Sequence, residues 1–224
     1  MAKQPKRLNV IAAAYLAATI VAVSPAVAQD FADTPEDPNT TRLLFGPTAR
    51  TLPKGDVTLG IHGLVLPSFQ VGITDRFSVG GGTPLLLPLP ASDRPYWITP
   101  KLQILNQGNT RIALGVVQTL NLSGVGVAYA VMTTGTSRQS VSAGAGVAYA
   151  RDGERRLAIM VGGDRQVRRS MKFVTENYYF AGLGVLSAGV RFFDERKSLD
   201  AAVVAPIDGY FPGLVPTLNF VYRF

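Results

Sequence analysis

The chain has 224 residues, enough for one sizeable domain, and is 47% hydrophobic but only 17% charged. This composition is too apolar for a disordered protein and poorer in charge than an average soluble domain. The chain has no cysteine, which excludes a disulfide framework, a thiolate nucleophile and a cysteine-ligated metal site. The net charge is +7, but the basic residues are scattered along the sequence, which argues against nucleic acid as a partner.

Residues 1–28 have the pattern of a secretory signal peptide. A basic start is followed by an uncharged apolar run, and Ala26 and Ala28 are the small residues expected at a cleavage site. The apolar run is shorter than the roughly 20 residues that a membrane-spanning helix needs. We expect cleavage after Ala28, which lowers the number of basic residues from 22 to 19 against 15 acidic ones, a net charge of +4.

Residues 29–55 are expected to form an N-terminal leader in the periplasm. Its first part, residues 29–41, is acidic and rich in proline, which is typical of flexible segments. A short apolar cluster follows, from Leu43 to Phe45. This cluster fits either a plug that packs under or inside the next domain or an ordinary first strand.

From Asp56 to Phe224 the dominant hydrophobic period is two, which is the period of a β-strand. In "GVGVAYAVM" (residues 124–132), valines and a tyrosine alternate with glycines and alanines. Short polar breaks such as "NQGN" (residues 106–109) and "DERK" (residues 194–197) are typical of hairpin turns. About twelve strands are predicted, with ten as the alternative, beginning near residues 56, 68, 76, 96, 110, 124, 139, 156, 171, 184, 198 and 215.

The two faces of these strands indicate a membrane protein. The face opposite valine and tyrosine is mostly Gly, Ala, Ser and Thr, with too few charges for the outer wall of a soluble protein. A membrane barrel needs an apolar outer band and tolerates a small or polar lining. The predicted fold class is therefore all-β, a closed antiparallel up-and-down transmembrane β-barrel over residues 56–224. A soluble exported β-barrel is the alternative.

The signal peptide, the absence of cysteine, the alternating strands and the final "LNFVYRF" resemble those of bacterial outer-membrane β-barrel proteins. "FGPTARTLPKG" and "VGITDRFSVGGGTP" are similar to stretches of small, functionally uncharacterised members of the porin-like class. The resemblance covers about residues 56–224. It implies the outer membrane of a Gram-negative-type bacterium, with outer-membrane lipid and lipopolysaccharide as partners.

The resemblance also implies an assembly route and an orientation. The last strand, with Phe220, Tyr222 and Phe224, is similar to the signal that the barrel-assembly machinery reads. A periplasmic C-terminus places the short polar turns on the periplasmic rim and the other loops outside. Arg151, Arg155 and Arg156 then lie at the outer rim, where lipopolysaccharide phosphates are candidate partners.

The leading functional hypothesis is a non-enzymatic barrel, either a narrow passive pore for small solutes or a structural barrel. No cofactor or metal ion is expected. We expect the polar side chains of the lining to shape any selectivity. These are His62, Lys101, Gln103, Asp164, Glu176, Arg191, Asp200, Asn219 and Arg223.

The alternative is a lipid-modifying or proteolytic barrel enzyme that uses His62, the single histidine, as a base. Outer-membrane lipid hydrolases carry a serine two residues from the histidine on one strand, but here that position is Leu64. The serine would have to come from another strand, and Ser78 is a candidate. A lone lumen histidine is more often a lining residue, so the sequence favours a protein without enzymatic activity.

Overall fold

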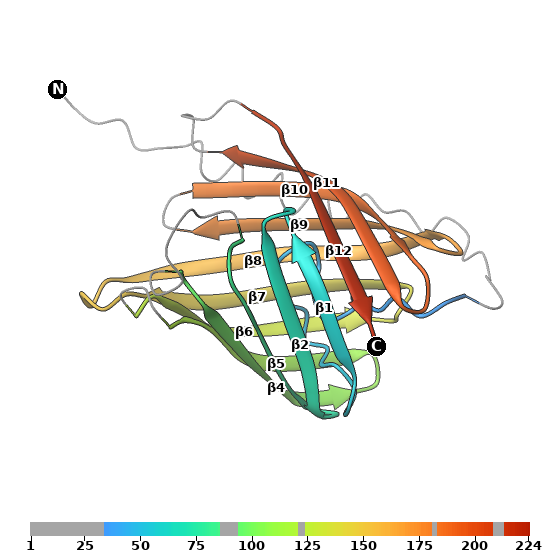
Figure 1. The fold of residues 1–224 in the computed structure, drawn as a ribbon, viewed down its shortest axis with the longest axis horizontal. Helices are drawn as coiled ribbons and strands as arrows, with labels where there is room; N and C mark the ends of the chain where they lie inside the picture. Colours follow the sequence, from blue (N-terminus) through green and yellow to red (C-terminus); the bar gives the residue numbers. More distant parts are fainter. Residues whose placement is uncertain (1–33, 86–93, 121–123, 181–182, 208–212) are drawn as a thin grey trace. The chain divides into compact units, whose positions relative to one another are not determined.

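The computed structural model describes residues 34–85, 94–120, 124–180, 183–207 and 213–224. The predicted signal peptide lies outside these residues. In the described part, twelve antiparallel strands form one closed barrel in which β1 pairs with both β2 and β12 (Figure 1). The strands are β1 (Val57–His62), β2 (Leu66–Thr74), β3 (Phe77–Gly82), β4 (Trp97–Gln107), β5 (Thr110–Thr119), β6 (Gly126–Gly135), β7 (Gln139–Tyr149), β8 (Arg155–Arg168), β9 (Met171–Phe180), β10 (Leu183–Phe193), β11 (Lys197–Ile207) and β12 (Val215–Arg223).

The predicted fold class and strand count are confirmed. Every predicted strand start lies within two residues of an observed one. Each strand pairs with its neighbours in the sequence, and the β1–β12 pairing closes the sheet, so the barrel has no free edge. Over the residues that the structure describes, no helix has the length and hydrophobicity needed to cross a membrane.

Short turns connect the strands at the end of the barrel where the chain ends. The β4–β5 turn has only two residues, and Gly108 there has a φ of 55°, as tight hairpins require. The backbone N–H of Arg223 donates to the carbonyl of Arg196, so the C-terminus lies beside the β10–β11 turn. We call this end the short-turn end. At the opposite end, the β3–β4, β5–β6, β7–β8 and β11–β12 connections are longer, whereas three residues join β1 to β2 and two join β9 to β10.

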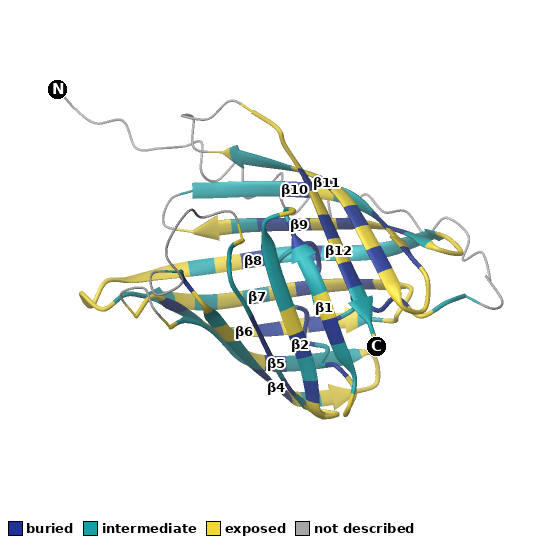
Figure 2. Ribbon diagram, viewed as in Figure 1, coloured by how far each residue is buried: buried dark blue, intermediate teal, exposed yellow. Residues whose placement is uncertain are grey.

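The faces of the strands separate an apolar outer wall from a polar lumen. On β12, Thr217, Asn219 and Val221 are buried, whereas Leu218 and Phe220 are exposed. This is the predicted division of the last strand. Buried and exposed residues alternate visibly along β11 and β12 in Figure 2.

On β6 the expectation that valine and tyrosine face outward and the small residues line the lumen is wrong. Tyr129 and Val131 point into the lumen, and Ala128 and Ala130 point outward. The reason is that strand alternation fixes which residues share a face but not which face is inside. An outward alanine is compatible with lipid, while the larger side chains fill the interior. Tyr178 and Phe193 also pack inside the barrel.

Residues 34–54, which we call the lumen segment, lie inside the barrel. A bridge between Arg42 and Pro47 closes its apex. Leu43 and Leu44 are buried in a cluster with barrel residues, and Ala49 is buried in a second one. In the described residues this segment lies inside the barrel and forms no strand of its own.

Within the described residues, part of the acidic segment is buried. Asp37, Asn39 and Thr41 are only 4%, 2% and 5% exposed. Segments of this composition stay flexible when nothing offsets the entropy of ordering them. Here the barrel interior supplies cations and hydrogen-bond partners to the buried polar groups.

Candidate functional site

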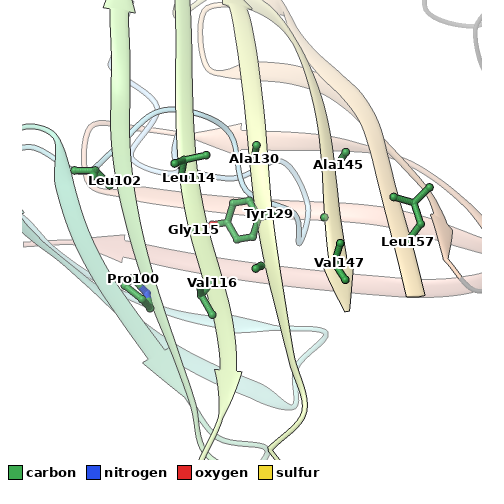
Figure 3. Close-up of a pocket in the computed structure, with 12 residues that line it drawn as sticks. Pro100, Leu102, Leu114, Gly115, Val116, Tyr129, Ala130, Ala145, Val147 and Leu157 are labelled. Atoms are coloured by element: carbon green, nitrogen blue, oxygen red, sulfur yellow. The ribbon is translucent and has the colours of Figure 1, made fainter. Parts of the chain in front are cut away.

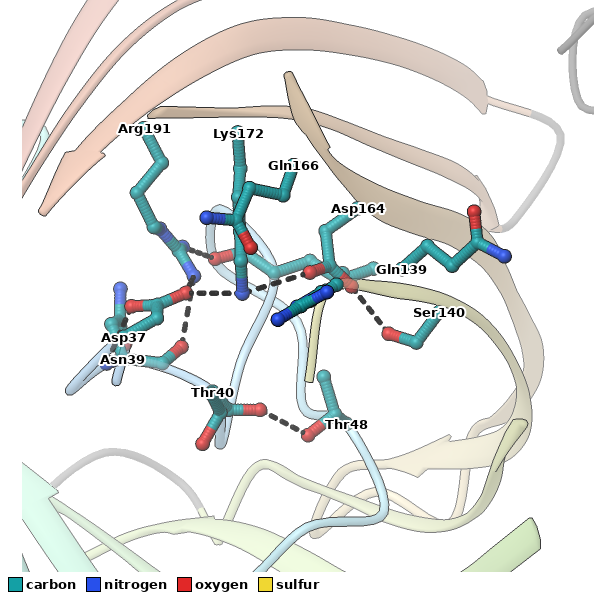
Figure 4. Close-up of polar contacts among 12 residues, drawn as sticks. Asp37, Asn39, Thr40, Thr48, Gln139, Ser140, Asp164, Gln166, Lys172 and Arg191 are labelled. Atoms are coloured by element: carbon teal, nitrogen blue, oxygen red, sulfur yellow. Dashed lines mark hydrogen bonds and ion pairs between the residues drawn. The ribbon is translucent and has the colours of Figure 1, made fainter. Parts of the chain in front are cut away.

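Five charged side chains form a buried cluster between the lumen segment and the barrel wall. Asp37 of the lumen segment lies 3.0 Å from Lys172 Nζ and 3.2 Å from Arg191 Nη1. Lys172 also pairs with Asp164 at 3.1 Å, and the Nε of Arg191 donates to Asp200 at 2.6 Å. Figure 4 shows Asp37 between the two cations. We call these five residues the ionic cluster.

The register of the sheet brings the barrel members of this cluster together. Arg191 of β10 is directly paired with Lys172 of β9 on one side and with Asp200 of β11 on the other. Directly opposed residues in an antiparallel sheet place their side chains on the same face. Asp164 of β8 is paired with Ser140 of β7, whose hydroxyl donates to it. The barrel therefore presents two cations, Lys172 and Arg191, each already paired with a barrel carboxylate, and Asp37 docks between these two cations.

The surroundings of Asp37, which lies on the lumen segment and not on a membrane-spanning strand, change its acidity. Burial raises the pKa of a carboxyl group, but here the positive charges of Arg191 and Lys172 outweigh it. A hydrogen bond from the backbone N–H of Asn39 acts in the same direction. Together they lower the pKa of Asp37 from 3.8 to about 2. The docked form is therefore the carboxylate.

At the apex of the lumen segment, the Glu176 carboxylate of β9 receives three consecutive backbone N–H groups. Those of Leu44, Phe45 and Gly46 donate to Oε2 at 2.8, 3.0 and 2.9 Å. The Tyr178 hydroxyl donates to the same carboxylate. Charge-assisted bonds of this kind are about twice as strong as neutral ones. The Glu176 side chain thus holds the apex through the backbone N–H groups of the lumen segment.

Both limbs of the lumen segment are also held from the opposite wall. Lys101 Nζ of β4 donates to the carbonyls of Thr41 and Thr48 at 3.0 and 3.2 Å. Gln103 donates to the Ala49 carbonyl at 2.7 Å. The N–H of Ala49 in turn donates to the Thr133 hydroxyl of β6 at 2.8 Å.

Both limbs of the lumen segment meet the barrel rim at the short-turn end. Glu36 lies 3.4 Å from Arg223, and the N–H of Lys54 donates to Asp75 at 3.0 Å. The segment therefore enters from this end, folds back at its apex and returns to the same end before β1.

All nine predicted lining residues point inward or lie at the rim of the lumen. Lys101, Gln103, Glu176, Arg191 and Asn219 bind the lumen segment directly. Asp164 and Asp200 act through Lys172 and Arg191, Arg223 pairs with Glu36 at the rim, and His62 contacts Arg42. The side chains expected to line a pore therefore hold a segment of the same chain.

Sequence reasoning missed Asp37, Lys172 and Thr133. Asp37 stands in a segment without periodicity, and Lys172 is next to a turn, where a lysine is usually solvated. Alternation gave one usable signal, since Lys172, Val174 and Glu176 share a face. A lysine on the same face as a lumen carboxylate was therefore a lumen candidate.

His62 does not form the arrangement that the enzyme hypothesis requires. Its Nε2 lies 3.0 Å from Arg42 Nη1 and 3.1 Å from the Ser68 hydroxyl. Because a guanidinium can only donate, Nε2 accepts from Arg42 and is not a free base. In the described residues His62 Nδ1 has no partner, so no carboxylate orients the ring as in a catalytic triad. The candidate Ser78 accepts a hydrogen bond from Gln70 instead, at 3.0 Å.

The remaining predicted residues lie at the two ends of the barrel. Phe220 and Phe224 are exposed, and the Tyr222 and Phe224 rings meet edge to face with their centroids 4.9 Å apart. Arg151, Arg155 and Arg156 are exposed in and beside the β7–β8 connection. Arg156 pairs with Glu154 at 3.0 Å. The roles of these residues in assembly and lipid contact remain predictions.

Comparison by sequence finds neither a matching family model nor a matching curated protein. Comparison by structure does find similar proteins. A KdgM porin in complex with disordered oligogalacturonate has a TM-score of 0.59 and 10% identity over 75% of this chain and 98% of the porin. A NanC porin has a TM-score of 0.52 and 7% identity over the same shares of the two chains. The chain therefore has the fold of small outer-membrane porins.

Proposed function

We propose that the protein is a non-enzymatic outer-membrane channel for small solutes whose passage is closed by its own lumen segment. The observation that carries this proposal is the docking of residues 34–54 onto polar lumen side chains from opposite walls of the barrel. The porin fold supports the channel part of the proposal, and the filled lumen supports the closed state.

The membrane placement is supported by the outer wall. Large apolar side chains are exposed on strands around the barrel, as a lipid-facing band requires. Examples are Leu59, Phe69, Leu102, Leu114, Phe173, Phe192 and Leu199, which are 44–54% exposed. A soluble protein of this size rarely exposes so much contiguous apolar surface.

The path of the lumen segment supports closure that can be reversed. Both limbs contact the rim at the short-turn end, through Glu36 and Lys54, and only the apex reaches Glu176. The segment can therefore leave as a loop toward that end without being threaded through the barrel. In the proposed orientation this end faces the periplasm.

An opened lumen would carry charges of both signs. Withdrawal of the segment leaves Lys101, Lys172 and Arg191 on the wall, together with Glu176, Asp164 and Asp200. Lys172 and Arg191 keep carboxylate partners on the barrel. Lys101 and Glu176 lose the backbone partners that the segment provides, so we expect these two residues to have the largest influence on passing ions.

Planar-bilayer recording of the full chain tests this function. We expect rare, brief openings of the unmodified protein and frequent discrete openings of Asp37→Asn, which weakens the docking of the segment. Glu36→Gln is the matched control, because the Glu36 side chain is exposed and lies 3.4 Å from Arg223. If all three proteins fold, as shown by heat-modifiable gel mobility, and none conducts, the protein is a structural barrel and not a channel.

A further inference from the structure

A polar cavity of about 190 Å³ lies at the short-turn end, between the lumen segment and the barrel wall. The lumen segment lines it with both limbs, including Arg50, and the barrel lines it with Asn106 of β4 and Arg111 of β5. This volume is about six times the share of one water molecule in liquid water, so the cavity admits a small solute. The groove on the outer wall in Figure 3 is lined mainly by apolar side chains such as Leu114 and Val147, which offer little to a charged solute.

The register of the sheet and the path of the lumen segment bring two arginines to this cavity. Arg111 is directly paired with Asn106 on one side and with Thr133 on the other, so these three side chains share one face of the sheet. Thr133 is buried and accepts a hydrogen bond from the N–H of Ala49, so this face is the inner one. Arg50 follows Ala49 in the chain. Arg50 of the lumen segment and Arg111 of the wall therefore meet at the cavity.

The charges of these two arginines are poorly compensated. Within the described residues, Arg50 donates to the Thr136 carbonyl at 2.5 Å and forms no ion pair, and Arg111 forms neither a hydrogen bond nor an ion pair. Burial lowers the pKa of Arg50, and the charge of Arg111 acts in the same direction, against the attraction of Asp164. An anion between the two guanidinium groups would relieve their repulsion.

The acidic residues of the cavity already have partners. Its lining holds three arginines, Arg50, Arg111 and Arg223, against two carboxylates, Glu36 and Asp75. Glu36 lies 3.4 Å from Arg223, and Asp75 accepts a hydrogen bond from a backbone N–H of the lumen segment at 3.0 Å. The cavity therefore keeps an excess of positive charge, which lies on Arg50 and Arg111.

We propose that this cavity binds a small phosphate-bearing solute, and that the bound anion holds the lumen segment in its docked position. Guanidinium groups pair with phosphate in a bidentate manner. Two of them together with the Asn106 amide can donate to more oxygens than the two of a carboxylate, and phosphate offers at least three oxygens and up to two negative charges.

The site couples ligand binding to closure because its donors lie on two parts of the molecule. Arg50 belongs to the lumen segment and Arg111 to the barrel, so the site is complete only while the segment is docked. A ligand that binds only the docked form stabilises it in proportion to the logarithm of the ligand concentration. In the proposed orientation the anion comes from the periplasm and keeps the passage closed. The inference rests on the closure in the proposed function, but the binding itself needs no conductance.

Isothermal titration calorimetry of the full chain in detergent, with inorganic phosphate at constant ionic strength in chloride, tests the site. Arg111→Gln removes one guanidinium and is expected to lower the affinity about tenfold. Arg76→Gln is the matched control, because Arg76 is exposed in the β2–β3 turn at the same end and does not line the cavity. It is expected to bind like the unmodified chain. Glycerol phosphate, titrated in the same way, shows whether an ester or the free ion is the tighter ligand.

Trypsin cleavage after Arg42 tests the coupling without a conductance measurement. Phosphate at a hundred times its dissociation constant for the unmodified chain is expected to slow cleavage of that chain and of Arg76→Gln up to about a hundredfold, and cleavage of Arg111→Gln only about tenfold. Equal affinities of test and control variants, or bound phosphate that leaves the cleavage rate unchanged, would overturn the inference. Absence of openings in Asp37→Asn would instead contradict the proposed function, whatever the phosphate titrations show.

Discussion

Arg191 of β10 donates a hydrogen bond to Asp37, a residue 154 positions earlier in the chain, at a distance of 3.2 Å. Both side chains are only 2% exposed, and the same guanidinium pairs with Asp200 at 2.6 Å. Removing one partner of a buried ion pair is costly because the other charge is left buried and uncompensated. This contact therefore connects the position of the lumen segment to the charges of the barrel.

Asp37→Asn is expected to loosen the lumen segment while the barrel stays folded. Lys172 and Arg191 keep their barrel partners Asp164 and Asp200. The substitution therefore weakens the docking of the lumen segment, by about 2 kcal/mol, and not the barrel. Trypsin should then cleave after Arg42 at least about tenfold faster than in the unmodified protein. Glu36→Gln is the matched control on the same segment. Similar cleavage rates in the two variants would show that Asp37 does not anchor the segment.

Acid is expected to release the lumen segment. The pKa of Asp37 is lowered from 3.8 to about 2 when docked, so its contribution is present above about pH 4 and is lost as the pH falls toward 2. The shift corresponds to about 2 kcal/mol of docking free energy. The rate at which an acid-stable protease cleaves the lumen segment, followed from pH 5 to pH 2, measures this release. Asp37→Asn should lack this pH dependence, and an unchanged profile would rule out Asp37 as its source.

Glu176→Gln is expected to destabilise the apex of the lumen segment by about 2 kcal/mol. An amide offers one acceptor oxygen and no charge, whereas the carboxylate accepts from Leu44, Phe45 and Gly46. Hydrogen exchange of these three amides, followed by mass spectrometry, should accelerate while the amides of β9 stay protected. Acceleration spread evenly over the barrel would indicate global loosening instead.

Gly72→Ala is expected to displace the end of the lumen segment from β2. A Cβ at this position would lie 1.8 Å from the carbonyl oxygen of Pro53 and 2.7 Å from that of Leu52. Both are backbone atoms, so the contact cannot be relieved by a rotamer change, and overpacking of this kind costs about 1–3 kcal/mol. Gly184→Ala is the control, since its nearest neighbour would be at 3.6 Å. Equal thermal stability of the two variants would contradict the close approach of the Pro53 carbonyl to Gly72.

The barrel could be predicted from the sequence because its signal is local. Strand alternation and turn residues placed strands such as β5 and β9 at their observed starts, Thr110 and Met171. The inward direction of Lys101 and Asn219 followed from the same alternation. On β6 the prediction of which face points inward failed, because both faces are apolar and alternation alone does not distinguish the lumen side from the lipid side.

The docking of the lumen segment could not be predicted, because no local pattern encodes it. Its backbone bonds to Glu176 span at least 130 positions of sequence, and its own secondary structure is one bridge, Arg42 to Pro47. Composition pointed to flexibility for residues 29–41, since acidic and proline-rich segments lack a hydrophobic reason to fold. The cations that hold Asp37 lie on strands far away in the chain, and only the closed barrel brings them together.

Closure of the passage by the lumen segment is the central claim, and a reversible cross-link tests it directly. The chain has no cysteine, so Ala49→Cys and Thr133→Cys, where the Ala49 N–H lies 2.8 Å from the Thr133 hydroxyl, introduce a single pair. In an Asp37→Asn background, single-channel recording should show frequent openings under reducing conditions, loss of openings on oxidation and their return on reduction. Openings that persist after complete cross-linking would contradict closure by this segment.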